Sequence, residues 1–274
     1  RVYNDIFQDF ENQLSRLESG EQVGSGILKT AYLLRQFHRL EPYRQQLIDM
    51  LQAKQDPRTG LIRNLPEYVC WPKGIADTTS MLRLLGSAMK YVPERMVELS
   101  QPGALVRWVQ QRNWDRPWGG ATGAGHMTIG MMFALSDLGL LKVSAMDEVF
   151  DFLDTIRDER YGVWAAGHFD PEHPGPQQLG GAFYFGILYD RFRRPLPGVE
   201  GACRMLMEMQ KETGTGTYNT DPKWEWPFGS TDHDALYVLL RYARLNGELY
   251  REVLPSVAWY AEYFVKQMTE GEGY

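Results

Sequence analysis

The sequence has little of what marks disulfide-bonded, membrane-spanning or nucleic-acid-binding proteins. Its 274 residues include only two cysteines, Cys70 and Cys203, which lie far apart and form no Cys-x-x-Cys pattern. This excludes a disulfide framework and a zinc knuckle. No apolar run reaches the roughly 18 residues of a membrane-spanning helix, so we expect no membrane span. Acidic residues outnumber basic ones by 35 to 29, and the basic residues form no stripe, so we expect no nucleic-acid partner.

These absences predict a soluble protein, and the low cysteine content favours the cytoplasm. No charged and then apolar leader opens the chain. The first residue is Arg1 rather than Met, which leaves room for a targeting segment removed by processing. The sequence leaves the oligomeric state open.

Strand signals and common catalytic motifs are also scarce. There are few period-two alternations and no Asn-Gly or Asp-Gly turn between β-branched runs. The patterns GxxxxGK[ST], GxSxG and HExxH are missing, which argues against the commoner nucleotide, hydrolase and zinc-protease sites. The segment HFDPEHPGP (168–176) holds two His and two acids, but their spacing matches no familiar metal set. We therefore expect no metal and no cofactor.

What the sequence does contain is a degenerate repeat. Four segments share an apolar residue, a polar residue four positions later, and a short turn that contains glycine; the polar anchors are Gln55, Asn113, Arg157 and Gln210. Each segment predicts the end of one helix, and a second helical stretch follows it. The second stretches are 74–92, 123–141, 179–192 and 230–247, and 24–40 is a fifth. Their apolar residues recur all around the helix, which is typical of an inner, buried helix.

The alternating partners of these inner helices, such as 145–160 and 251–268, carry charges on one face and are expected outside. The sequence thus predicts an all-α fold, an α/α toroid of five to six inner and outer helical hairpins, as a single domain over residues 1–274. Residues 1–20 are a candidate outer helix that completes the ring. The alternatives are an irregular helical bundle and an open solenoid.

In such a ring the inner helices run parallel, so their N-termini meet at one mouth with free N–H groups and positive dipole ends. The candidate catalytic residues at these starts are Asp77, His126, Asp232 and His233. The two aspartates could equally be helix caps, and a lone His on an apolar helix is often a core residue. Neighbours on a helix point about 100° apart, so Asp232, His233 and Asp234 cannot all reach one substrate atom.

Aromatic residues gather near the same predicted mouth. We assign Trp71, Trp118, Trp164, Tyr184, Tyr218 and Trp226 as candidate substrate-binding residues. Side chains of this kind pack against hydrocarbon or against the apolar face of a sugar ring. For any single Trp the alternative is packing between a loop and a helix.

The four repeat segments resemble the QW-type repeat of terpenoid cyclases and protein prenyltransferases. The closest copy consists of Leu206, Gln210, Gly216 and Tyr218, with Tyr in the place of Trp. The segment GIADTTSMLRLL (74–85) resembles the Asp-x-Asp-Asp-Thr segment of class II cyclases, although only Asp77 and Thr78 match it. The resemblance implies an α/α toroid and an isoprenoid or other hydrophobic substrate. It does not imply a zinc site, because no Cys lies at the position where a prenyltransferase needs a zinc ligand.

Three functions follow as hypotheses. The first is an enzyme of the cyclase or prenyltransferase type, with an aromatic-lined cavity and acid or base chemistry on an apolar small molecule. The second is a glycoside hydrolase or polysaccharide lyase on the same ring, with a glycan substrate. The third is a noncatalytic binding toroid.

Overall fold

The computed structural model describes residues 2–21, 23–24, 26–63, 71–118, 123–164, 175–218 and 230–270. The all-α prediction is confirmed for these residues, because they contain helices and two isolated β-bridges but no strand. None of the described helices is both long and apolar enough to cross a membrane.

Twelve α-helices and one 3-10 helix follow one another along the described chain. Their bounds are α1 (Val2–Glu18), α2 (Gly26–Leu33), η1 (Phe37–Tyr43), α3 (Arg44–Ala53), α4 (Trp71–Leu84), α5 (Glu94–Leu99), α6 (Ala104–Gln110), α7 (Ala124–Asp137), α8 (Val143–Thr155), α9 (Pro176–Arg191), α10 (Val199–Thr213), α11 (Ser230–Ala243) and α12 (Gly247–Glu270).

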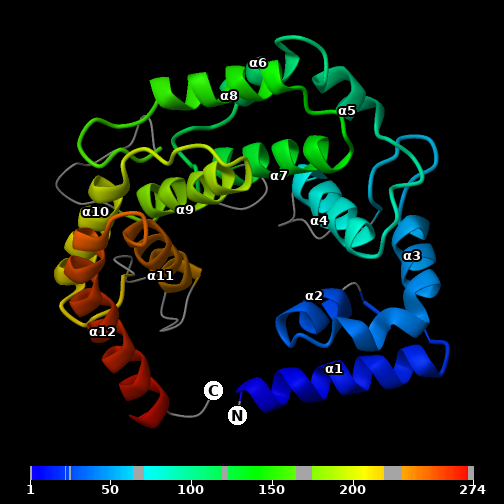
Figure 1. Cartoon of the computed structure of the whole chain (residues 1–274), viewed down its shortest axis with the longest axis horizontal. Helices are drawn as coiled ribbons and strands as arrows, with labels where there is room; N and C mark the ends of the chain where they lie inside the picture. Colours follow the sequence, from blue (N-terminus) through cyan, green and yellow to red (C-terminus); the bar gives the residue numbers. More distant parts are fainter. Residues whose placement is uncertain are drawn as a thin grey trace.

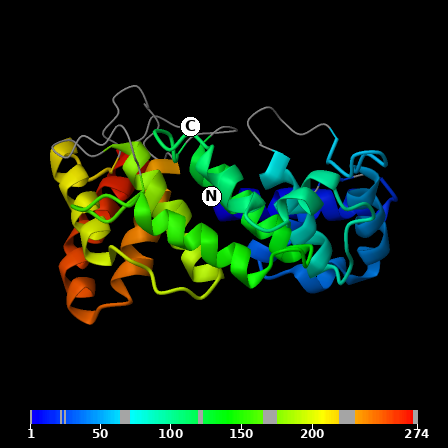
Figure 2. The same cartoon turned by 90° about the horizontal axis from the view of Figure 1, so that it is seen from above.

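The helices are arranged in a curved row of inner and outer members. In Figure 1, α2, α4, α7, α9 and α11 border the middle of the molecule, while α3, α6, α8, α10 and α12 lie outside them. Along the inner side, α4 contacts α7, α7 contacts α9, and α9 contacts α11. Figure 2, turned by 90°, shows the inner and outer helices at a similar height, so the molecule is one layer of helices thick.

The inner helices α4, α7, α9 and α11 run in the same direction. Near their C-terminal ends, the buried carboxylate of Asp137 (α7) pairs with Arg83 (α4) at 3.5 Å and with Arg191 (α9) at 3.1 Å. Asp190 (α9) pairs with Arg241 (α11) in the same part of the row. Side chains at the N-terminal ends of α7, α9 and α11 also meet, as described below. The free N–H groups of these helices therefore face one side of the molecule.

Two of the predicted anchors tie each repeat to the next. Gln55 is 2% exposed, and its amide donates to the carbonyls of Gly60 at 3.1 Å and Tyr91 at 2.7 Å. Its carbonyl oxygen accepts the N–H of Lys90 at 2.7 Å. Gln210 does the same at the last turn, where its amide donates to its own turn glycine and to a carbonyl of α12. The spacing between anchor and glycine thus reflects a hydrogen-bonded turn.

The turn glycines are required by both conformation and space. Gly60 and Gly162 have φ of +69° and +67°, the left-handed region that favours glycine. A Cβ at Gly60 would lie 2.8 Å from the nitrogen of Pro93, which caps α5. A Cβ at Gly162 would lie 2.6 Å from the Cα of Gly198, which caps α10. Each turn therefore packs directly on the start of a later helix, α5 for Gly60 and α10 for Gly162.

Helix ends differ from the prediction most at 74–92. The corresponding helix, α4, begins at Trp71 and ends at Leu84. Gly86 follows with φ of +68°, a left-handed conformation that stops an α-helix. The predicted stretch 24–40 likewise divides into α2 and the 3-10 helix η1.

The hydrophobic core lies behind the inner row of helices. One buried cluster extends from α1 to α9 and a second joins α9 to α12, with Leu196 packed against both.

Candidate functional site

Five side chains lie near the N-terminal ends of α7 and α11 and beside the middle of α9, and we refer to them as the rim cluster. They are Trp118, which precedes α7, His126 of α7, Tyr184 of α9, and His233 and Asp234 of α11. The sequence spacing between the first and last of these residues exceeds one hundred positions. The parallel packing of three inner helices is what brings them together.

Small residues and a local cap position the backbone of this cluster. Pro176 occupies the first turn of α9, and the side-chain oxygen of Gln178 accepts the N–H of Gly175 at 2.9 Å. A Cβ at Gly180 would lie 1.9 Å from the Cβ of Trp118. A Cβ at Gly125 would lie 2.4 Å from the ring of Tyr184. Glycine at these two positions therefore lets both aromatic side chains approach the helix starts.

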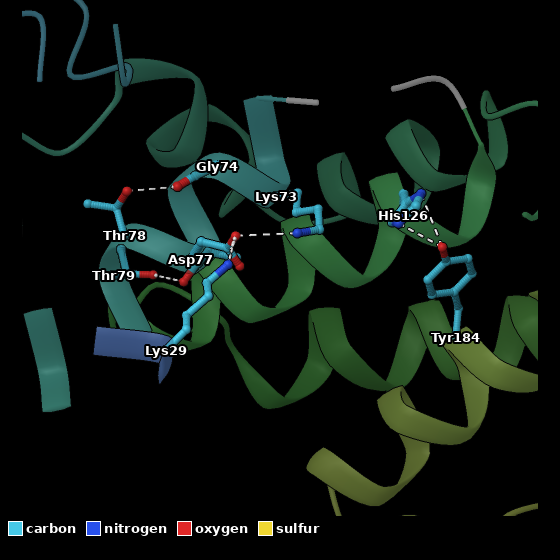
Figure 3. Close-up of polar contacts among 9 residues, drawn as sticks. Lys29, Lys73, Gly74, Asp77, Thr78, Thr79, His126 and Tyr184 are labelled. Carbon is cyan, nitrogen blue, oxygen red and sulfur yellow. Dashed lines mark hydrogen bonds and ion pairs between the residues drawn. The ribbon is translucent and has the colours of Figure 1, made fainter. Parts of the chain in front are cut away.

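His126 and Tyr184 form the shortest contact in the rim cluster. The hydroxyl of Tyr184 lies 2.6 Å from Nε2 of His126, and the ring centroids are 4.4 Å apart. Figure 3 shows the two side chains pointing toward one another from neighbouring helices. Tyr184 is 8% exposed, whereas His126 is half-buried. The imidazole is therefore the more accessible of the two groups, and its tautomer decides which atom donates.

Asp234 holds the other half of the rim cluster. Its Oδ2 accepts a hydrogen bond from the indole N–H of Trp118 at 3.0 Å, and its Oδ1 lies 3.2 Å from Nδ1 of His233. Burial raises the pKa of Asp234, and the hydrogen bonds from His233 and Trp118 oppose that shift. The side chain of His233 is 76% exposed. Asp234 therefore orients an exposed imidazole from a buried position.

Phe183 connects the two halves of the cluster. Its ring centroid lies 5.3 Å from that of Tyr184 and 6.1 Å from that of His233, both in edge-on contacts. The same ring contacts Tyr237 of α11 at 5.2 Å. His233 thus contacts the ring of Phe183, whereas His126 contacts the ring of the adjacent residue, Tyr184.

Asp232, a predicted catalytic residue, points away from this cluster. It is 1% exposed, and its Oδ1 accepts hydrogen bonds from the Tyr218 N–H and the Thr217 hydroxyl, both at 2.7 Å. Its Oδ2 is buried and has no partner among the described residues. Burial raises the pKa of Asp232. Helical geometry thus sends Asp232, His233 and Asp234 in three directions, and His233 alone of the three is exposed.

Asp77 belongs to a separate charged group. Its Oδ2 lies 3.0 Å from Nζ of Lys29 in α2 and 3.3 Å from Nζ of Lys73, one turn earlier in α4. Figure 3 shows this pair of ion pairs apart from His126 and Tyr184. The adjacent Thr78 hydroxyl donates within the helix to the carbonyl of Gly74. Among the residues that the structure describes, the ion pairs of Asp77 do not reach the rim cluster.

The predicted aromatic residues are divided between the core and the rim. Trp164 is 1% exposed and donates to the carbonyl of Leu153, and Tyr218 is fully buried with its hydroxyl 2.9 Å from Ser256. Trp71 is half-buried, with an edge-on contact to Trp108. Trp118 and Tyr184 belong to the rim cluster. Trp226 lies outside the described residues.

An apolar surface adjoins the rim cluster, and the sequence reasoning did not identify it. On α7, α9 and α11 half-buried apolar residues follow one another at intervals of one to four positions, on the least buried side of each helix. These inner-face residues are Ile129, Phe133, Phe183, Ile187, Leu236, Tyr237 and Leu240. A helix buried on three sides has apolar residues all around, so this side carried no distinct signal in the sequence. Asp234 was likewise considered only as one of three neighbours.

Groups of three or more His, Cys, Asp or Glu side chains that could hold a metal ion do not occur among the described residues. No protein-family model, curated protein or solved structure matches the chain. Function must therefore be argued from the rim cluster and the inner-face residues themselves.

Proposed function

We propose that this protein is an enzyme with an α/α toroid of the terpenoid cyclase or prenyltransferase type. It binds an apolar, isoprenoid-like small molecule against the inner-face residues and transfers a proton at that substrate through His126. The observation that carries this proposal is the hydrogen bond between His126 and Tyr184 at the end of an apolar surface.

The composition of the inner face supports an apolar substrate. Its seven residues are aliphatic or aromatic, and Tyr237 is the one member with a polar atom. Removing such surface from water contributes about 25 cal/mol for each Å². Phe183 and Tyr237 also present ring faces and edges, which suit an alkene or a developing positive charge.

The rim cluster contains the side chains proposed to transfer and position the proton. An imidazole is the side chain whose ordinary pKa lies nearest neutrality, and general acid or base catalysis is most efficient there. Tyr184 fixes the orientation of the His126 ring through its hydrogen bond. Asp234 gives His233 a comparable support through the contact between its Oδ1 and Nδ1 of His233. We assign the proton transfer to His126 and the positioning to Tyr184.

A carbohydrate enzyme is the second candidate. The His126 and Tyr184 pair favours it, because proton transfer is equally what cleavage of a glycan needs. Among the candidate tryptophans, Trp164 does not support it, because it is buried and donates to the carbonyl of Leu153, whereas Trp71 and Trp118 are half-buried.

The test combines binding with turnover. Binding of all-trans farnesol is measured by titration calorimetry, and polyprenyl substrates are then incubated with the protein and the products separated by gas chromatography. We expect His126→Gln to abolish product formation while farnesol still binds. Tyr184→Phe keeps the ring against Gly125 and should lower turnover more than affinity. Phe183→Ala should weaken binding, because it removes inner-face area.

Matched controls separate these effects from misfolding. His38→Gln, Tyr250→Phe and Phe7→Ala make the same changes at exposed positions outside the rim and inner face. They should leave binding and turnover unchanged. Failure to bind or convert any isoprenoid, together with cleavage of a polysaccharide that depends on His126, would establish the second candidate instead.

A further inference from the structure

An apolar pocket lies between α2 and α4, away from His126 and Tyr184. It has a volume of about 350 Å³, within the range of roughly 300–1,000 Å³ for small-molecule sites. Its apolar walls are formed by Leu28, Tyr32, Leu33, Met81 and Leu84. We refer to this site as the α2–α4 pocket.

The outer part of this pocket exposes large apolar side chains to solvent. Leu33 is 74% exposed, Tyr32 65% and Leu84 51%, whereas Leu28 and Met81 are buried at its base. Three such residues around one concavity form a patch rather than isolated surface residues. A ligand with a hydrocarbon chain would remove all three from water.

Two residues with charged side chains border the same pocket, whose walls are almost entirely apolar. Lys29 and Asp77 belong to the lining and are joined by an ion pair of 3.0 Å. Lys73 adds a second ammonium group at 3.3 Å from Asp77. Two ammonium groups against one carboxylate leave a single unit of positive charge.

The ion pairs also show which ammonium group is available. Lys29 reaches Asp77 across the gap between two helices, and its side chain is 56% exposed. Lys73 is held to Asp77 within one turn of the same helix. If Lys29 turns to a ligand, Asp77 keeps Lys73 as its partner, so no carboxylate is left without a counter-charge. An exposed ion pair of this kind is also weak, at about 0–1 kcal/mol.

We propose that the α2–α4 pocket binds a free long-chain carboxylate. The hydrocarbon chain packs on Leu28, Met81 and the exposed apolar residues, and the carboxylate pairs with Lys29. The one excess positive charge matches a singly charged head group. This proposal does not rest on the proposed function, because the pocket and its charged residues are distinct from His126, Tyr184 and the inner-face residues.

A head-group series tests the charge. Dodecanoate, dodecanol and dodecyltrimethylammonium share one chain and differ in head charge. The two ions are titrated below their critical micelle concentrations, and dodecanol is titrated below its solubility limit. We expect dodecanoate to bind about tenfold more tightly than dodecanol, because it gains a hydrogen bond between charged groups. Lys29→Met should lower dodecanoate affinity by about the same factor and leave dodecanol affinity unchanged. Lys29→Arg should restore dodecanoate binding.

Apolar variants and matched controls complete the test. Leu33→Ser and Leu84→Ser change exposed residues, so the fold should tolerate them, and each should weaken both dodecanoate and dodecanol. Lys211→Met and Leu245→Ser are the corresponding exposed changes away from the pocket and should alter neither affinity.

Three outcomes would overturn the proposal. One is equal binding of the three head groups, which would identify an unspecific apolar patch. Another is dodecanoate binding that Lys29→Met does not change. The third is absence of dodecanoate binding together with recruitment to vesicles of equal parts phosphatidylcholine and phosphatidylglycerol, which would identify a membrane-surface contact. Because His126 and Tyr184 are intact in every variant, failure here is distinguishable from failure of the proposed function.

Discussion

Replacement of Gln210 by Met tests directly whether the buried glutamine anchors stabilise the fold. Gln210 is 1% exposed. Its amide donates to the carbonyls of Gly216 at 2.7 Å and Ser256 at 3.0 Å, and its oxygen accepts the Ser256 hydroxyl at 2.6 Å. Methionine has nearly the same length and volume, so Gln210→Met removes these bonds without opening a cavity.

The expected loss follows from the groups that remain. A buried polar group left without a hydrogen-bond partner costs about 1–3 kcal/mol. The Gly216 carbonyl loses its side-chain donor, while the Ser256 hydroxyl keeps the Tyr218 hydroxyl at 2.9 Å. We therefore expect the free energy of unfolding to fall by about 3 kcal/mol. Gln55→Met, at the equivalent turn, should cost a similar amount, because it removes bonds to Gly60, Tyr91 and Lys90.

Urea unfolding followed by circular dichroism measures both changes, from the shift in midpoint at constant slope. Gln101→Met is the matched control, since Gln101 is exposed and the hydrogen bond from its side-chain amide to the Val97 carbonyl is 3.4 Å long. It should shift the free energy of unfolding by less than about 0.5 kcal/mol. If Gln55→Met and Gln210→Met were as mild as this control, the anchors would not hold the repeats together, and the reasoning would be refuted.

Three further predictions concern backbone space, pH and thiol reactivity. Gly181→Ala should destabilise the fold by about 1–3 kcal/mol, because its Cβ would lie 2.0 Å from the Trp164 carbonyl oxygen; Gly247→Ala, with open space, is the control in the same melting assay. Burial raises the folded pKa of Asp234, so its contribution to stability is present below the unfolded pKa of about 4 and is lost as the pH rises through the folded pKa. Asp234→Asn should therefore flatten the fall in stability that begins as the pH rises above about 4; an unchanged slope in urea titrations would contradict this. Cys203 is fully buried, and burial raises its thiol pKa to about 12, so in a Cys70→Ser background Ellman's reagent should react only at the unfolding rate.

Much of the fold could be predicted because the repeat is a local pattern. The anchor, the turn glycine and the two helices around them lie within a few tens of residues, and Gln55 and Gly60 meet within one turn. The starts of α7, α9 and α11 were predicted within three residues for the same reason. The end of α4 was not, because the left-handed Gly86 breaks a pattern that apolar periodicity alone would continue.

Less of the site could be predicted, because its members come from different repeats. His126 and Tyr184 were each singled out at a helix start, but their 2.6 Å contact depends on how closely α7 and α9 pack, which Gly125 permits. The contact between His233 and Asp234 could not be predicted for another reason. Asp232, His233 and Asp234 are equivalent in the sequence, and the direction of each is set by the rotation of α11 about its axis.

By itself, the sequence determined the helical class, the alternation of inner and outer helices and the turns between them, because periodicity and glycine act over short distances. The tertiary structure alone decided which charged groups meet. Asp232 is buried and accepts a hydrogen bond from the turn of its own repeat, and Asp77 pairs with two lysines. His126 lies beside Tyr184, next to the inner-face residues. The physical reason is that a side chain's partner depends on the rotation and spacing of whole helices, and these are set by packing contacts that lie far apart in the chain.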